Sequence, residues 1–185
     1  DAQLHLSHIA QRSLLLDVAV WSDGGNDSQW RSVLTPSLVN RYPQPEGHLG
    51  IRMETAVRSH LNTHDVVILL GPDAVQFNKS HLQRLVEGAL DHGVAIAPAL
   101  DGGYVALACT RAVLPALQAL FSEHIAWGTP SVAEQTRHAL SLFSMSACWL
   151  EPQMDIDEPD DLKQAVDQGF VPPNWNELTG GDKNE

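Results

Sequence analysis

The fold is decided by residues 65–73, DVVILLGPD. The run from Val66 to Leu70 is wholly aliphatic and has the length of a strand that is buried on both faces. Gly71 and Pro72 end the run, because both residues are typical of turns. We therefore expect a central parallel strand over residues 65–70, with Asp73 just beyond its carboxyl end.

Further strands and helices alternate on both sides of this run. Apolar runs predict strands over residues 14–21, 38–42, 94–100, 104–109 and 145–150. Apolar residues at helical spacing predict helices over residues 48–61, 82–90, 131–142 and 159–168. This alternation is typical of a three-layer α/β/α domain around a mostly parallel sheet. We expect one such domain over residues 1–169 and a C-terminal tail over residues 170–185.

Composition and charge exclude several kinds of partner. The 185 residues carry a net charge of −12 without a cluster of Lys or Arg, so we expect no binding to nucleic acid. No apolar run approaches the roughly 20 residues that span a bilayer, so we expect no membrane association. No basic-then-apolar leader opens the chain, and Cys109 and Cys148 lie in apolar stretches without metal-ligand spacing. These features favour a cytoplasmic location.

Aspartates follow three of the predicted strands. Asp73 follows the strand over residues 65–70, Asp101 follows the strand over residues 94–100, and Asp155 and Asp157 follow the last strand. Ligands of α/β proteins gather at the carboxyl ends of the strands, and Mg²⁺ prefers carboxylate oxygens. Each acid alone is explained by a turn or a helix cap. Their repetition after successive strands favours a cation site.

Five blocks of sequence occur in an order that resembles one bacterial family. They are QPEGHLGIRM (residues 44–53), GPD (71–73), DGGY (101–104), WGTP (127–130) and DIDEPDDL (155–162). The chain is similar over residues 4–166 to GT-A-fold, nucleotide-diphospho-sugar transferase-like proteins of the arsenosugar-biosynthesis type. The last block also resembles the closing motif of 2-phospholactate guanylyltransferase-type nucleotidyltransferases. The resemblance implies transfer of a sugar or nucleotidyl group from a nucleotide sugar or nucleoside triphosphate to a small-molecule acceptor.

The resemblance also implies roles for particular residues. It places Mg²⁺ or Mn²⁺ on Asp73 and Asp157, with Asp155 beside them, and makes Asp101 the catalytic residue that orients or deprotonates the attacking hydroxyl. The implied substrate-binding residues are Gly47, Gly50 and Arg52 near the donor, Gly102, Gly103 and Tyr104 in the turn after Asp101, and Trp127 and Thr129 near the acceptor.

The chain departs from the pattern of this family in three places. Members begin with a strand and a basic, glycine-rich loop that grips the nucleotide phosphates, and this sequence begins after that point. Ala74 and Val75 stand where Ser-Pro is usual, and Leu100 stands where Glu is usual. These departures leave open a second function, a catalytically decayed binding or assembly module.

Histidine spacing offers a further alternative. His5 and His8 lie three residues apart, and His60 and His64 lie four apart, as metal ligands on one helix face would. No glutamate completes a His-Glu-x-x-His motif, and surface histidines on helices are common. We rank a histidine metal site below both functions above.

Overall fold

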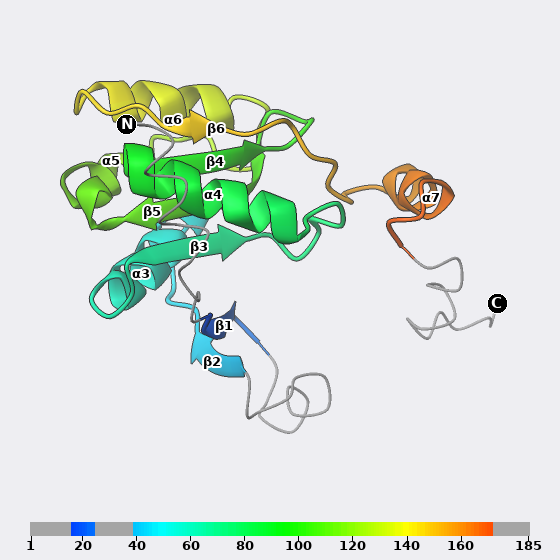
Figure 1. Cartoon of the computed structure of the whole chain (residues 1–185), viewed down its shortest axis with the longest axis horizontal. Helices are drawn as coiled ribbons and strands as arrows, with labels where there is room; N and C mark the ends of the chain where they lie inside the picture. The colour runs from blue at the N-terminus through cyan, green and yellow to red at the C-terminus, as the bar shows by residue number, and fades with distance from the viewer. Residues whose placement is uncertain (1–15, 25–38, 172–185) are drawn as a thin grey trace, which may run out of the picture.

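The computed structural model describes residues 16–24 and 39–171, and Figure 1 shows how their elements are arranged. Every predicted helix and strand is present, within a few residues of its expected bounds. The elements in chain order are β1 Val18–Ser22, β2 Val39–Pro43, α3 Leu49–Leu61, β3 Val66–Leu70, α4 Lys79–His92, β4 Val94–Pro98, β5 Tyr104–Thr110, the 3₁₀ helix η1 Arg111–Ala116, α5 Leu117–Leu120, α6 Val132–Ser141, β6 Cys148–Trp149 and α7 Pro159–Asp167.

The larger sheet has four strands in the order β3-β5-β4-β6. β4 and β6 are parallel, whereas β5 is antiparallel to both β3 and β4. β3, β4 and β6 therefore run in one direction, and the expected α/β fold with mostly parallel strands is confirmed. The central position expected for the strand over residues 65–70 is wrong, because β3 pairs only with β5 among the described strands. The short turn between β4 and β5 returns the chain beside β4 and inserts β5 between β4 and β3.

The core lies on both faces of β4 and β5. Val94 and Ile96 face an apolar cluster to which α3, α5 and α6 contribute, whereas Ala95 and Ala97 face a second cluster to which α4 contributes. These small side chains let α4 approach the sheet closely, since a Cβ on Gly88 would lie 3.1 Å from the Ala95 Cβ. In Figure 1, α4 crosses the front of the sheet and α3 lies behind it, which makes three layers.

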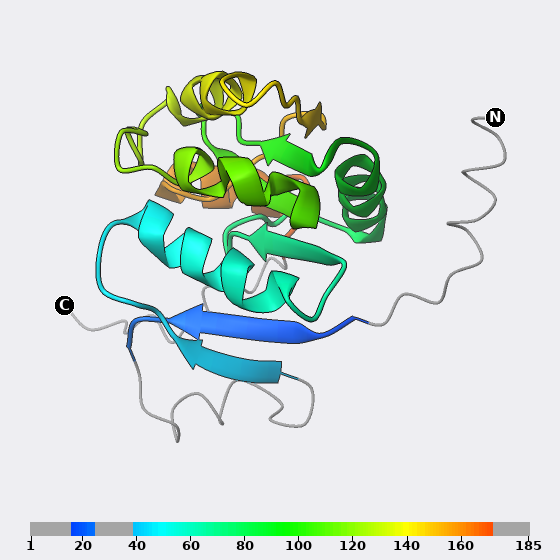
Figure 2. The same cartoon turned by 90° about the vertical axis from the view of Figure 1, so that its left-hand side faces the viewer.

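The β1–β2 ribbon, formed by β1 and β2 alone, is a separate two-stranded parallel sheet. No backbone hydrogen bond joins it to the larger sheet within the described ranges 16–24 and 39–171. Figure 2 shows the ribbon below α3 and β3, outside the compact part of the molecule. Among the described residues, side chains on and after α3 contact the ribbon, as described below.

The last helix, α7, packs on a small cluster of its own. Ala165 is buried with Met154 and Val171, and Leu162 and Val166 pack against them. Residues 172–185 lie outside the described residues, so the predicted tail stays a prediction.

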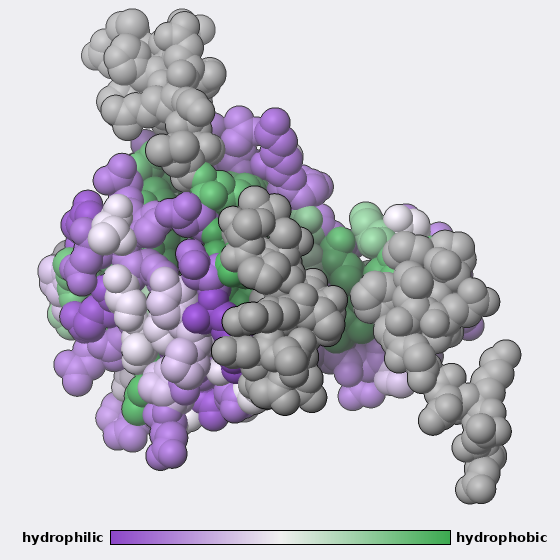
Figure 3. All heavy atoms as spheres, turned by 90° about the horizontal axis from the view of Figure 1, so that it is seen from below, coloured by the Kyte–Doolittle hydropathy of each residue, from purple (hydrophilic) through white to green (hydrophobic). Residues whose placement is uncertain are grey.

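The face in Figure 3 is mostly hydrophilic where it is described, with an apolar patch between the body and the α7 end. None of the helices in the described ranges is long and apolar enough to cross a membrane.

A cluster of three aspartates at the end of the sheet

The turn between β4 and β5 fixes Asp101. One carboxylate oxygen of Asp101 accepts a hydrogen bond from the Gly103 backbone N–H at 2.8 Å, and the Ala99 N–H donates to the Gly103 carbonyl at 3.1 Å. Gly102 has a φ of 96°, a backbone conformation that residues other than glycine rarely adopt. A Cβ on Gly102 would also collide with the Pro130 carbonyl. Gly102 and Gly103 thus shape the turn that carries Asp101, and their predicted substrate-binding roles stay predictions.

A second segment carries Asp155 and Asp157 to the same place. After β6, the Gln153 N–H donates to the Pro98 carbonyl at 2.8 Å, and the Leu100 N–H donates to the Gln153 carbonyl at 3.1 Å. This pairing continues the parallel alignment of β4 and β6 beyond the strands, shifted by one residue, up to the Asp101 turn. Asp155 follows two residues later, so the backbone ladder places its carboxylate beside Asp101.

Two glutamine side chains hold this segment, and the sequence analysis singled out neither. Gln153 is buried, at 5% exposure, and its amide N–H₂ donates to the Glu151 carbonyl at 2.9 Å. The side-chain oxygen of Gln76, in the loop after β3, accepts from the Met154 N–H at 3.0 Å. Glutamine amides that satisfy the backbone give no pattern in a single sequence, so no signal could have found them.

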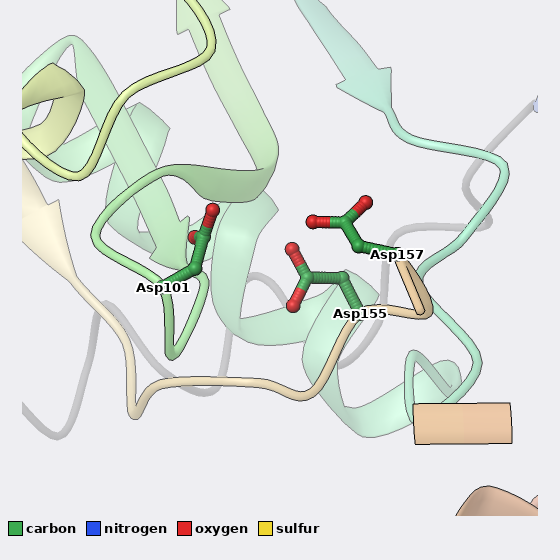
Figure 4. Close-up of side chains that lie close together, drawn as sticks. All are labelled: Asp101, Asp155 and Asp157. Atoms are coloured by element: carbon green, nitrogen blue, oxygen red, sulfur yellow. The ribbon is translucent and has the colours of Figure 1, made fainter. Parts of the chain in front are cut away.

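The carboxylates of Asp101, Asp155 and Asp157 converge on one space (Figure 4). One oxygen from each lies within 4.8 Å of the others. Asp155 is half-buried, and its burial, followed by the charges of Asp101, Asp157 and Asp73, raises the pKa of its carboxyl group. Negative charge is therefore crowded at this point of the structure. Among the described residues this is the only group of three or more His, Cys, Asp or Glu side chains placed to hold a metal ion.

Asp73 lies near this cluster but outside it. Its charge contributes to the raised pKa of Asp155, whereas its carboxylate folds back over Gly71. The sequence analysis grouped Asp73 with Asp155 and Asp157 and gave Asp101 a separate role. The structure instead brings Asp101 together with Asp155 and Asp157. The metal-binding and catalytic roles of all four acids stay predictions.

The predicted donor-side residues are engaged with protein groups. Arg52 donates to the Gly47 carbonyl at 3.0 Å and to the Gln44 side-chain oxygen at 3.0 Å, and it pairs with Asp23 at 3.3 Å. Gly47 has a φ of 120°, and a Cβ on Gly50 would collide with the Phe121 carbonyl. Arg52 therefore ties the start of α3 to the ends of β1 and β2.

The predicted acceptor-side residues pack between the Asp101 turn and the start of α3. Trp127 lies edge-on to Tyr104 at 6.4 Å between ring centroids, and its indole N–H donates to the Ser122 carbonyl at 3.1 Å. The Tyr104 hydroxyl lies beside Thr136 without a well-formed hydrogen bond, and burial raises its pKa. Thr129 donates its hydroxyl to the Ala126 carbonyl at 2.7 Å. Trp127 and Thr129 are thus engaged with other protein groups, and their predicted acceptor roles stay predictions.

The remaining histidine pairs do not join the cluster. His60 Nε2 accepts a hydrogen bond from the Trp21 indole, and His64 Nε2 binds Asp17, so these two nitrogens are engaged with protein groups. His5 and His8 lie outside the described residues.

Comparisons with known proteins agree with this architecture. None of the curated proteins compared with the chain matches it. A crystal structure of a Desulfovibrio desulfuricans protein, provisionally described as a nucleotide-diphospho-sugar transferase, superposes with a TM-score of 0.75. It shares 22% identity, and the similarity covers 96% of this chain and 78% of that protein, which confirms the expected fold. The profile of a bacterial family matches residues 6–129, which include Asp101 and end before Asp155 and Asp157. The chain therefore belongs to the family described as "Uncharacterized protein conserved in bacteria (DUF2064)".

Proposed function

We propose that this protein is a metal-dependent transferase that uses a nucleotide-activated donor, either a nucleotide sugar or a nucleoside triphosphate, and a small-molecule acceptor. The observation that carries the proposal is the convergence of Asp101, Asp155 and Asp157 at the carboxyl end of the sheet. The similar fold of the Desulfovibrio desulfuricans protein supports the class of chemistry. The finer likeness to arsenosugar or phospholactate enzymes stays a prediction.

The cluster is chemically suited to Mg²⁺ or Mn²⁺. Hard divalent cations bind carboxylate oxygens, and Mg²⁺ is usually held by one or two carboxylates together with substrate phosphates. Burial and, after it, repulsion from neighbouring acids raise the pKa of Asp155, and a bound cation would favour its charged form. Bound there, the cation would supply charge neutralisation for the diphosphate leaving group of a nucleotide-activated donor. Asp155 and Asp157 would hold it, and Asp73 lies close enough to add its charge.

Asp101 has two possible roles in this proposal. Its carboxylate is fixed by the Gly103 N–H, which leaves a second oxygen to face the cluster. It would either complete the cation shell or accept the proton of the acceptor hydroxyl. An Asp101→Asn variant that keeps Mn²⁺ affinity and loses turnover would assign it to the proton.

A second function, a binding or assembly module without turnover, is favoured by one observation. Arg52, the only cation among the predicted site residues, is engaged with Gly47, Gln44 and Asp23. Donor phosphates would then depend on the metal ion for neutralisation.

A cytoplasmic setting is also part of the proposal, and it is supported by the free thiols of Cys109 and Cys148.

Thermal-shift screening tests the proposal. We expect nucleotide sugars or nucleoside triphosphates to raise the melting temperature in the presence of Mn²⁺ and to have no effect in its absence. The Asp157→Asn variant should lose this stabilisation. The matched control is Asp91→Asn, which removes an exposed acid at the far end of α4 and should keep it. Stabilisation by donors without turnover of any acceptor would favour the binding module, and no stabilisation by any donor would refute the proposal.

A further inference from the structure

Two histidines at the end of α3 hold the β1–β2 ribbon. His60 contacts Trp21 of β1 and Tyr42 of β2, with ring centroids 5.9 and 5.1 Å away. His64, one turn later, binds the carboxylate of Asp17, immediately before β1, at 2.9 Å. The ribbon has no backbone pairing with the larger sheet among the described residues, so these side chains are principal contacts that hold it in place.

The contact of His60 requires a neutral ring. The Trp21 indole N–H lies 3.2 Å from His60 Nε2. An indole nitrogen can only donate, so Nε2 must present its lone pair. A proton on Nε2 would place two donors face to face and abolish the bond. This requirement follows from the donor inventory alone.

The contact of His64 favours a charged ring. Its Nε2 needs a proton to donate to Asp17, and the carboxylate stabilises the imidazolium form. Its Nδ1 lies 3.2 Å from the His60 carbonyl, which can only accept. Thr63, whose hydroxyl lies 2.9 Å from the same nitrogen, can donate or accept and suits either form. Both ring nitrogens of a charged His64 are therefore satisfied.

We propose that His60 and His64 form a pH-dependent clasp, in which a neutral His60 and a charged His64 together hold the β1–β2 ribbon on α3. The rings lie 5.9 Å apart, so a charge on one disfavours a charge on the other. The two contacts are complete together only in the pH interval in which His64 is charged and His60 is neutral. The ribbon is held less tightly on both sides of this interval.

The surrounding charges agree with this assignment. Burial, followed by the charge of His64, lowers the pKa of His60. Hydrogen bonds to Asp17 and to the His60 carbonyl, with further help from Asp65, raise the pKa of His64. Asp65 is itself paired with Arg111 at 3.6 Å, and Tyr42 faces His60 from β2.

The His60 contact is therefore lost as the pH falls, and the His64 contact is lost as the pH rises. The stabilisation from His60 is present above the ordinary histidine pKa and is lost as the pH falls through its lowered value. The stabilisation from His64 is present below the ordinary value and is lost as the pH rises through its raised value. The clasp is thus tightest near the ordinary histidine pKa of about 6.5.

The clasp acts on the predicted donor side of the site. β2 leads directly into Gln44 and Gly47, both of which Arg52 binds. Movement of the ribbon would weaken the contacts of Arg52 with Gln44 and Asp23, while its bond to the Gly47 carbonyl stays within the loop before α3. The clasp itself does not depend on the proposed chemistry, and its test needs no activity.

Nuclear magnetic resonance of the wild-type protein tests the clasp directly. Across about pH 5 to 8, we expect the Trp21 indole N–H resonance to shift with the titration of the His60 ring. The protection factors of the β1 and β2 amides, corrected for intrinsic exchange, should pass through a maximum and fall about two- to tenfold on the acidic side, the range for one hydrogen bond. Amides of β4 should show no such maximum. A Trp21 resonance that does not move with His60 would overturn the proposal.

Glutamine variants separate the two halves of the clasp. His60→Gln keeps an acceptor for Trp21 without a titrating proton, so the fall in the protection factors of β1 and β2 at acidic pH should disappear. His64→Gln removes the charged contact with Asp17, so the fall in these protection factors at alkaline pH should disappear. The control is His138→Gln, which replaces an exposed histidine near the end of α6 and should leave both falls unchanged. An acidic fall that persists in His60→Gln would contradict the assignment.

Discussion

The two sheets of this molecule are held together by different forces. In β4 the side chains from Val94 to Ala97 are fully buried, so apolar contacts on both faces fix the strand. In β1 Val18 is 43% exposed, and the ribbon depends on hydrogen bonds and ion pairs to α3. The aspartate cluster is built on the first region and the predicted donor loop on the second. The proposed cation site is thus attached to the well-packed region, and the predicted donor side to the less buried ribbon.

Truncation of a strand residue in each region should show the largest contrast. Ile96→Ala should lower the free energy of unfolding by about 2–5 kcal/mol, because Ile96 is fully buried and leaves a cavity. Val18→Ala should cost less than about 1 kcal/mol, because half-exposed positions lose little burial. Urea denaturation measures both. Equal losses would show that the ribbon is as well packed as the sheet.

Gly102→Ala should have the next largest effect. The new Cβ would collide with the Pro130 carbonyl and oppose the φ of 96°, so we expect a loss of about 1–3 kcal/mol. The displaced turn should also weaken Mn²⁺ binding by moving Asp101. The matched control is Gly128→Ala, where φ is 76° but no atom lies within 4 Å of the Cβ, so only backbone strain remains. If both variants bind Mn²⁺ like the wild type, the turn does not position Asp101.

Arg52→Gln should loosen the ribbon by about 1 kcal/mol, because exposed ion pairs and hydrogen bonds contribute little each. Hydrogen exchange should accelerate in β1 and β2 and stay unchanged in β4. Arg58→Gln, which removes only an i,i+4 pair with Glu54 on the same helix, is the control. A change confined to donor binding, with no faster exchange in the ribbon, would assign Arg52 to substrate instead.

Asp155→Asn should change the free energy of unfolding least, and it should raise this free energy where the other variants lower it. The pKa of Asp155 is raised, so its protonated form stabilises the fold, and this stabilisation is lost as the pH rises through the raised value. The neutral variant should therefore be slightly more stable than the metal-free wild type at neutral pH, by less than about 1 kcal/mol. Thermal melts measure this order, and the addition of Mn²⁺ should make the wild type more stable than the variant. A destabilised metal-free variant would mean that Asp155 has a structural role.

The sequence predicted the elements of the fold better than their order. Apolar runs and helical spacing placed the described strands and the helices α3, α4, α6 and α7, because local periodicity is a property of each segment. They did not predict η1 and α5, which follow β5 directly. The edge position of β3 could not be predicted in the same way, since it follows from the return of β5 beside β4. The two-residue length of β6 also depends on pairing with β4 alone.

The site was predictable in its parts but not in its grouping. Acids after successive strands identified Asp101, Asp155 and Asp157, because strand ends share one edge of a sheet. That Asp101 and not Asp73 would join the other two depends on Gln153 pairing with Pro98. Such a contact between distant segments leaves no mark on the periodicity of the sequence.

Calorimetric titration with Mn²⁺ tests the central claim most directly. If Asp101, Asp155 and Asp157 form a cation site, the wild-type protein will bind one Mn²⁺ saturably, and Asp155→Asn will weaken this binding at least tenfold, or about 1.4 kcal/mol. The control Asp91→Asn will bind like the wild type. Saturable binding of equal strength in all three proteins, or none in the wild type, would contradict the account.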